Sequence, residues 1–172
     1  MSHGLMDRKS ILTNVLCPTE SVSATKWVDD GVALFDLMKQ NSLEGVVGKE
    51  KIGLYHENKR EWKKVKCWQE GTFVAVGYTP GTGWRASTFG ALVLADTNGN
   101  YVGEVGTGFT EGDIRKLFAT FKMNPVSPNP GGKVWKMAPK QTTYIMSFPV
   151  KVKYLEFSNE GILRFPVFKG VV

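Results

Sequence analysis

The sequence is poor in the residues that most often carry metal or nucleophile chemistry. It contains two cysteines, Cys17 and Cys67, and two histidines, His3 and His56. Two isolated cysteines form neither a disulfide framework nor a zinc site, so a reducing environment is expected. With so few histidines, an enzyme built on a Ser-His-Asp or Cys-His arrangement is not expected.

Long apolar stretches are also missing. No run approaches the roughly 18 apolar residues of a membrane-spanning helix, and residues 1–5 (MSHGL) lack the apolar core of a signal peptide. We therefore expect neither a membrane partner nor a secretion signal. The 172 residues are 42% hydrophobic and 12% aromatic, which is enough to bury a core in one domain or two small ones.

Basic residues outnumber acidic ones, 22 to 16, which gives a net charge of +6. Residues 49–66 hold seven Lys or Arg against three acids, and residues 114–155 hold eight Lys or Arg and no acid. Such an excess suits a polyanionic partner. A solvated surface is the alternative explanation of the same charge runs.

Two short helices and two short strands are predicted in the first part of the chain. Apolar residues repeat at helical spacing over 7–16. A second helix is expected to begin at Asp29 or Asp30, because either carboxylate can cap the first amides. Strands are predicted over 43–49 and 62–68.

Strands dominate after residue 71. They are predicted over 72–78, 89–95 and 101–106, with a Pro-Gly turn at 80–83 and an Asn-Gly turn at 96–100.

A helix is predicted to begin at Thr110, capped through Asp113. Its buried face carries Ile114, Leu117, Phe118 and Phe121.

A long Pro/Gly-rich connection is expected over 123–147, followed by strands over 150–157 and 162–168. Three strands, one helix and two strands is the order of a five-stranded OB barrel. We expect a closed or nearly closed barrel over about 70–172, with the helix at one end.

Five segments resemble the ATP-dependent DNA ligases. Leu43–Lys49 (LEGVVGK) and Trp62–Lys66 (WKKVK) are similar to motifs IV and V of the covalent nucleotidyltransferases. Phe89–Leu94 (FGALVL) and Val102–Thr110 (VGEVGTGFT) resemble the OB domain of these ligases, most of all the ligase D type of bacterial and archaeal end joining. Leu163–Gly170 (LRFPVFKG) resembles the start of the family's terminal motif VI.

The resemblance implies an α+β, mostly β chain of two parts. Residues 1–68 would be the C-terminal part of a nucleotidyltransferase (adenylation, ATP-grasp-like) domain, and residues 69–172 an OB-fold DNA-binding domain. The implied reaction seals nicks or breaks in duplex DNA during repair. It uses ATP and Mg²⁺ and passes through lysyl-AMP and DNA-adenylate intermediates.

Roles for individual residues follow from the same resemblance. Lys64 and Lys66 stand two positions apart on a strand, so they face one side, and they would grip the α-phosphate of the nucleotide. Glu44 would bind the metal, since Mg²⁺ prefers oxygen ligands. Gly45 would allow close backbone approach, and Lys49 would help to bind nucleotide phosphate.

Basic side chains along the chain are the candidate DNA contacts. They are Lys59, Arg60, Arg85, Lys133, Lys136, Lys151, Lys153, Arg164 and Lys169. Alternation along the strand should point the 151 and 153 side chains away from the core. Trp84 is expected to pack against its surroundings, whereas Trp135 could either follow a DNA backbone or anchor the long connection.

The implied partners are nicked or broken duplex DNA, an end-joining Ku-type protein and the N-terminal half of a ligase. The resemblance also implies a cytoplasmic, nucleoid-associated location.

The family's nucleophile, a lysine in Lys-x-Asp-Gly, does not occur in these residues, where Val28–Gly31 reads VDDG. Motif III and the Arg-x-Asp-Lys element of motif VI are not found either. We therefore expect that this chain does not adenylylate itself. Two alternatives stay open: a stand-alone DNA-binding OB protein with vestigial motifs, and a relative of the mRNA capping guanylyltransferases. The VGEVGTGF segment favours a ligase over a capping enzyme.

Overall fold

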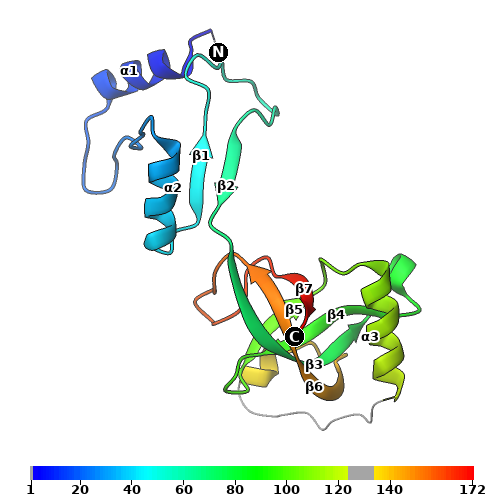
Figure 1. Ribbon diagram of the computed structural model, residues 1–172. Coiled ribbons are helices and arrows are strands. Elements are labelled where there is room, and N and C mark those ends of the chain that lie inside the picture. Colours follow the sequence, from blue (N-terminus) through cyan, green and yellow to red (C-terminus); the bar gives the residue numbers. More distant parts are fainter. Residues whose placement is uncertain (1, 124–133) are drawn as a thin grey trace. The chain divides into compact units, whose positions relative to one another are not determined.

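The chain folds into two compact units, Met1–Cys67 and Trp68–Val172 (Figure 1). The computed structural model describes residues 2–123 and 134–172. The predicted connection over 123–147 therefore lies partly outside the described residues. Within the described ranges, no helix is long and apolar enough to cross a membrane.

The first unit contains the two helices and two strands predicted from the sequence. They are α1 (Leu5–Val15), α2 (Gly31–Gln40), β1 (Gly45–Gly48) and β2 (Lys63–Lys66). The strands pair antiparallel, and α2 packs beside β1 (Figure 1). Asp30 is the N-cap of α2, because its carboxylate accepts from the amides of Val32 and Ala33 at 3.1 and 3.0 Å.

This unit has almost no buried interior. From residue 2 to residue 66 no side chain is buried, and apolar residues of both helices and both strands stay exposed. Val15 on α1 and Val32 on α2 are 71% and 74% exposed. A two-stranded sheet with one helix beside it is too small to cover its own apolar faces.

The second unit is built on one antiparallel sheet with the strand order β5-β4-β3-β6-β7. The strands are β3 (Gln69–Pro80), β4 (Phe89–Ala95), β5 (Tyr101–Val105), β6 (Thr143–Tyr154) and β7 (Val167–Val171). The number and order of strands match the OB-type prediction.

Two boundaries of that prediction are wrong. β6 begins at Thr143, inside the predicted connection. The predicted strand over 162–168 is interrupted: Leu163 forms a single bridge with Phe157, and the last strand begins only at Val167. Phe165 has a φ of 53°, and Pro166 has no amide to donate, so neither continues a ladder.

The sheet does not close through a ladder between its edge strands. Over the described residues, β5 and β7 each pair with one neighbour. Backbone bonds run instead from Phe168 N–H to the Thr107 carbonyl and from Leu163 N–H to the Val102 carbonyl, both at 2.8 Å. The structure thus contains a five-stranded antiparallel sheet with these two backbone bonds beyond its ladders, and a closed barrel is not found among the described residues.

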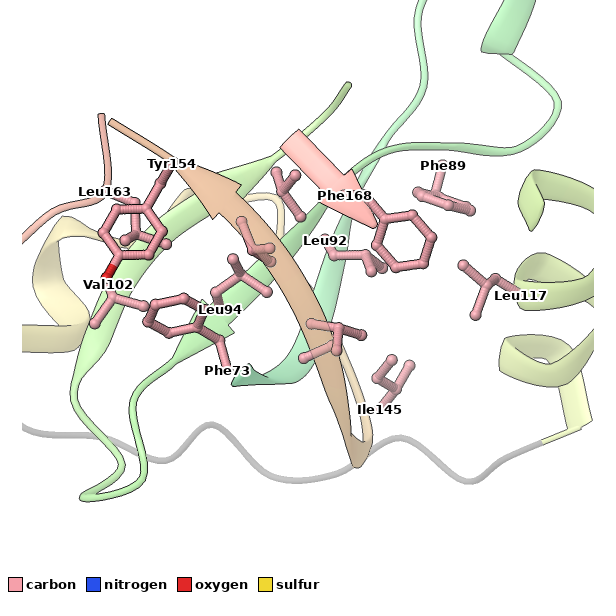
Figure 2. Close-up of a cluster of buried hydrophobic side chains, with 14 of the residues drawn as sticks. Phe73, Phe89, Leu92, Leu94, Val102, Leu117, Ile145, Tyr154, Leu163 and Phe168 are labelled. Carbon is pink, nitrogen blue, oxygen red and sulfur yellow. The ribbon is translucent and has the colours of Figure 1, made fainter. Parts of the chain in front are cut away.

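The core lies between the sheet and α3 (Glu111–Met123). Phe89, Leu92 and Val105 are fully buried, and α3 contributes Ile114, Leu117 and Phe121. Figure 2 shows labelled members of this core, among them Phe89 and Leu92 from β4 and Leu117 from the helix. The predicted buried face of the helix is confirmed, with the Phe118 side chain at its margin.

Thr110→Ala is expected to lower the free energy of unfolding by about 1 kcal/mol at pH 7. The Thr110 hydroxyl accepts from the Asp113 amide at 3.1 Å, and the Asp113 carboxylate accepts from the Thr110 amide at 2.8 Å. Hydrogen bonds from Thr110, first from its hydroxyl and then from its amide, lower the pKa of Asp113. The carboxylate therefore contributes stability above the ordinary Asp pKa and loses it as pH falls through the lowered value.

Urea unfolding at pH 7 and at about pH 3 measures this cap. The difference between wild type and Thr110→Ala should shrink at acid pH. Thr120→Ala is the matched control, because that hydroxyl donates to the Lys116 carbonyl within α3 and not to the first turn of the helix. An equal loss for both variants, or a loss that does not change with pH, would contradict the capping argument.

Candidate functional site

Lys64 and Lys66 lie on one face of β2. Lys64 pairs with Val47 and Lys66 with Gly45, while Lys63 and Val65 alternate to the other face. The predicted geometry of the lysine pair is therefore present. Two ammonium groups on one strand face can hold one phosphate between them.

Gly45 allows β1 and β2 to approach closely beside this pair. A Cβ at this position would stand 2.1 Å from the Val65 carbonyl oxygen, and the φ of Gly45 is 142°. The adjoining Glu44 carbonyl accepts from the Cys67 amide at 2.8 Å, while the Glu44 side chain is exposed.

The Glu44 carboxylate can supply one ligand to a metal ion. In the described part of the chain, no group of three or more His, Cys, Asp or Glu side chains is arranged to hold one. Mg²⁺ is commonly bound by one or two carboxylates together with substrate phosphates. The oxygens of the exposed Glu44 carboxylate are of the kind that Mg²⁺ prefers, so the chemistry of this side chain fits an ion that would arrive with a nucleotide.

Lys49 lies against an aromatic ring. Its Nζ is 3.7 Å from the ring centroid of Trp62, a cation–π contact. Burial, and then the charges of Lys9 and Arg8, lower the pKa of Lys49. Three cations therefore influence one another here, which favours an anionic ligand over a cationic one. Lys59 and Arg60 are exposed on the connection between β1 and β2.

Three of the predicted DNA contacts lie on the outer face of β6 and β7. Val150, Val152 and Tyr154 are buried, so Lys151 and Lys153 point away from the core, as predicted. On β7, exposed Lys169 follows buried Phe168. The Lys153 ammonium lies 5.0 Å from the ring centroid of Trp68. These residues, Lys151, Lys153 and Lys169, are called the β6–β7 basic face.

Arg85 has a bracing role that the sequence did not reveal. Its guanidinium donates to the carbonyls of Gly90 and Gly106, at 3.1 and 2.9 Å, and it is half-buried. The neighbouring Trp84 is 75% exposed, so the expectation that it packs is wrong. The short 3-10 turn η1 (Gly83–Arg85) directs the indole outward while Arg85 turns back to the sheet.

Arg164 forms an ion pair with Glu156 and lies 5.6 Å from the Phe165 ring. Phe165 is 54% exposed and adopts a left-handed backbone conformation, which is rare for a bulky side chain. Such outliers concentrate at functional sites, and Phe165 is a candidate contact that sequence reasoning missed. The Arg-Phe-Pro run gave no signal for this conformation, because a residue before proline normally adopts extended backbone with negative φ.

Trp135, on η2 (Val134–Met137), is buried. Its indole N–H donates to the Gly99 carbonyl at 3.0 Å, and its ring packs on Tyr101 and Tyr144. Of the two alternatives, the anchoring role is the one found. Lys136 beside it is exposed, whereas Lys133 lies outside the described residues.

The five-stranded antiparallel sheet with α3 packed on its core is an OB-type arrangement, and the segments similar to motifs IV and V contain β1 and β2. A family model described as the ATP dependent DNA ligase C terminal region matches residues 85–171. The chain belongs to this family. Membership favours the ligase interpretation over the capping-enzyme alternative.

Relatives with curated descriptions agree. The chain is 30% identical to the multifunctional non-homologous end joining protein LigD of Mycolicibacterium smegmatis, over 96% of this chain and 23% of that protein. It is 35% identical to a DNA ligase of Caldivirga maquilingensis, over 66% of this chain and 22% of the relative. The chain thus spans about a quarter of the length of these relatives, or less.

Solved structures support the fold. The ligase domain of LigD from M. tuberculosis superposes with a TM-score of 0.56 at 24% identity, over 96% of this chain and 55% of that one. A Lig E DNA ligase structure superposes with a TM-score of 0.64 at 20% identity, over 99% and 59%.

Proposed function

We propose that this chain acts as the C-terminal part of an ATP-dependent DNA ligase that seals nicks or breaks in duplex DNA. The family match over 85–171 is the observation that carries the proposal. The lysine pair on β2 supports it. Residues 1–68 would complete an adenylation domain, and the second unit would be its OB domain.

In the proposed reaction, a lysine nucleophile attacks the α-phosphorus of ATP, and the bond to pyrophosphate breaks. Because no Lys-x-Asp-Gly occurs in these 172 residues, that lysine has to come from a further ligase segment. Lys64 and Lys66 would hold the α-phosphate oxygens as negative charge develops on them. Lys49 would contact the remaining phosphates.

Glu44 is the proposed ligand of a Mg²⁺ ion. When bound, the ion would neutralise phosphate charge during both transfers. The carboxylate itself would fix the position of the ion beside the lysine pair. AMP would then pass to the 5′-phosphate of the break, and the 3′-hydroxyl would displace it.

DNA is the proposed partner of the basic side chains. The β6–β7 basic face is the best-supported part, because strand alternation directs Lys151 and Lys153 away from the core. Lys151 and Lys169 are exposed, and Lys153 is half-buried. Lys59, Arg60, Lys133, Lys136 and Arg164 are further proposed contacts. Arg85 would act mainly by bracing the turn that carries Trp84.

Charge reversal at the β6–β7 basic face tests this function. Lys151→Glu with Lys153→Glu is expected to weaken duplex binding about tenfold at low salt. It should also flatten the slope of log K against log salt by about two, because two phosphate contacts are lost. Fluorescence anisotropy with nicked and intact duplexes over a series of KCl concentrations measures both quantities.

Lys39→Glu with Lys116→Glu is the matched control. It makes the same change of charge at exposed positions on α2 and α3, so it accounts for the effect of net charge alone. If both double variants bind alike, or wild type binds no DNA at low salt, the proposed DNA contact is wrong.

The stand-alone OB alternative makes a different prediction. Under it, the chain binds nicked duplex, but Lys64 and Lys66 contribute nothing to DNA joining.

An end-joining context is also proposed, with a Ku-type protein as partner at the DNA end and a nucleoid-associated location in the cytoplasm. The relatedness to LigD proteins supports it. A Ku-type protein should increase the amount of this chain that is retained on linear DNA. Equal retention on circular DNA would contradict this context.

A further inference from the structure

Trp84 has a larger exposed fraction, 75%, than any other aromatic side chain in the described part of the chain. It lies on η1, between β3 and β4. Leaving an indole in water is unfavourable, and this one lies outside the buried core of the second unit.

The turn that carries Trp84 is held in place by several hydrogen bonds. The Arg85 amide donates to the Thr82 carbonyl at 3.1 Å, and the Thr88 amide donates to the Arg85 carbonyl at 2.8 Å. The Arg85 guanidinium is fixed by the carbonyls of Gly90 and Gly106. A short turn fixed at both its backbone and its side chain presents the indole in a restricted set of orientations.

The guanidinium also lies beside the indole. Its Cζ is 4.8 Å from the ring centroid of Trp84, within cation–π range. Arg85 is the only charged residue between positions 71 and 95. A flat aromatic surface backed by a positive charge, with no acid nearby in sequence, suits a flat aromatic group that is attached to an anion. A nucleotide of a nucleic acid has this chemistry, because its neutral base stacks well on indole and its phosphate carries the negative charge.

We propose that Trp84 stacks on an unpaired base at a broken DNA end; this inference rests on the proposed function above. Bases inside an intact duplex are stacked on both sides and offer no free face. A single-stranded overhang exposes base faces directly. The Trp84 turn would therefore discriminate DNA ends from continuous duplex, which the non-specific phosphate contacts of the lysines do not.

The test compares Trp84→Ala with Trp84→Phe on two DNA ligands by fluorescence anisotropy. One is a duplex with a 3′ single-stranded overhang, and the other is a duplex closed by hairpin loops of non-nucleosidic linker at both ends. Trp84→Ala should weaken overhang binding about tenfold, the lower part of the range for loss of one base–aromatic stack. Binding to the closed duplex should change less than about twofold, and the phenylalanine variant should retain most of the overhang affinity.

Trp27→Ala is the matched control, because Trp27 is also exposed, at 48%, but lies in the first unit. Melting temperatures of all variants should match wild type, since neither indole is buried. Equal affinity of Trp84→Ala and wild type for the overhang overturns the inference, and so does an equal loss on both ligands. If wild type binds the closed duplex but shows no preference for the overhang, the inference fails while the proposed function stands. If wild type binds neither ligand, both fail.

Discussion

Incubation of this chain with radiolabelled ATP and magnesium should leave no label on it after a denaturing gel. The reason is that the family's nucleophile, the lysine of Lys-x-Asp-Gly, does not occur in these residues. The proposed role of Lys64 and Lys66 is to hold phosphate oxygens, not to attack the phosphorus. The segment that most resembles the missing motif is Val28–Gly31. Its two aspartates already make structural contacts. Asp30 caps α2, and Asp29 forms an ion pair with Lys51 at 2.7 Å.

Adding a second polypeptide with a Lys-x-Asp-Gly motif turns this negative result into a positive test of the lysine pair on β2. Together with such a segment of a related ligase, label should appear on the added segment. Its amount should fall by at least a hundredfold with Lys64→Ala and Lys66→Ala combined, which is within the range for removal of charge-stabilising groups. Lys63→Ala, on the opposite face of β2, is the control and should have little effect. Label on this chain itself would show that another lysine serves as nucleophile.

Gly108→Ala should destabilise the second unit by about 3–5 kcal/mol, because clash and backbone strain add. Gly108 has a φ of 92°, and an added Cβ would stand 2.4 Å from the Phe168 carbonyl oxygen. Relief of that clash would move β7 away from Thr107. It would also disturb the Phe109–Phe168 stack, whose ring centroids are 4.3 Å apart.

The expected fall in melting temperature is about 15 °C or more, measured by circular dichroism. Gly161→Ala is the control, since Gly161 also has a positive φ, 76°, but open space where the Cβ would lie. That variant isolates the cost of placing a Cβ on a residue with positive φ, about 1–2 kcal/mol. Similar melting temperatures for the two variants would mean that contact between β7 and the Gly108 turn contributes little to stability.

Local sequence signals were sufficient for most elements of this fold. The helix from Thr110 follows from a cap and an apolar repeat within a few turns of chain, and the β4–β5 hairpin follows from Asn98–Gly99. The start of β7 could not be predicted in this way. It depends on the conformation of Phe165 and on bonds to Thr107, which is far away in sequence.

The residues of the candidate site also fall into those that local sequence signals placed correctly and those that they did not. Alternation along a single strand was enough to place Lys64 with Lys66 and Lys151 with Lys153 on common faces. The opposite directions of Trp84 and Arg85 depend on the carbonyls of Gly90 and Gly106, which come near only after β4 and β5 have paired. Residues whose direction is decided by distant backbone groups are therefore the ones that sequence reasoning misjudged.

The central position of β3 has a consequence for how the protein is made. Its pairing with β4 is local, but on its other side Tyr78 pairs with Thr143 and Gln69 with Tyr154. While the ribosome synthesises the intervening residues, β3 presents a long unpaired edge to other nascent chains, and such edges invite intermolecular pairing. The yield of soluble protein should therefore depend on how quickly β6 follows β3 out of the exit tunnel.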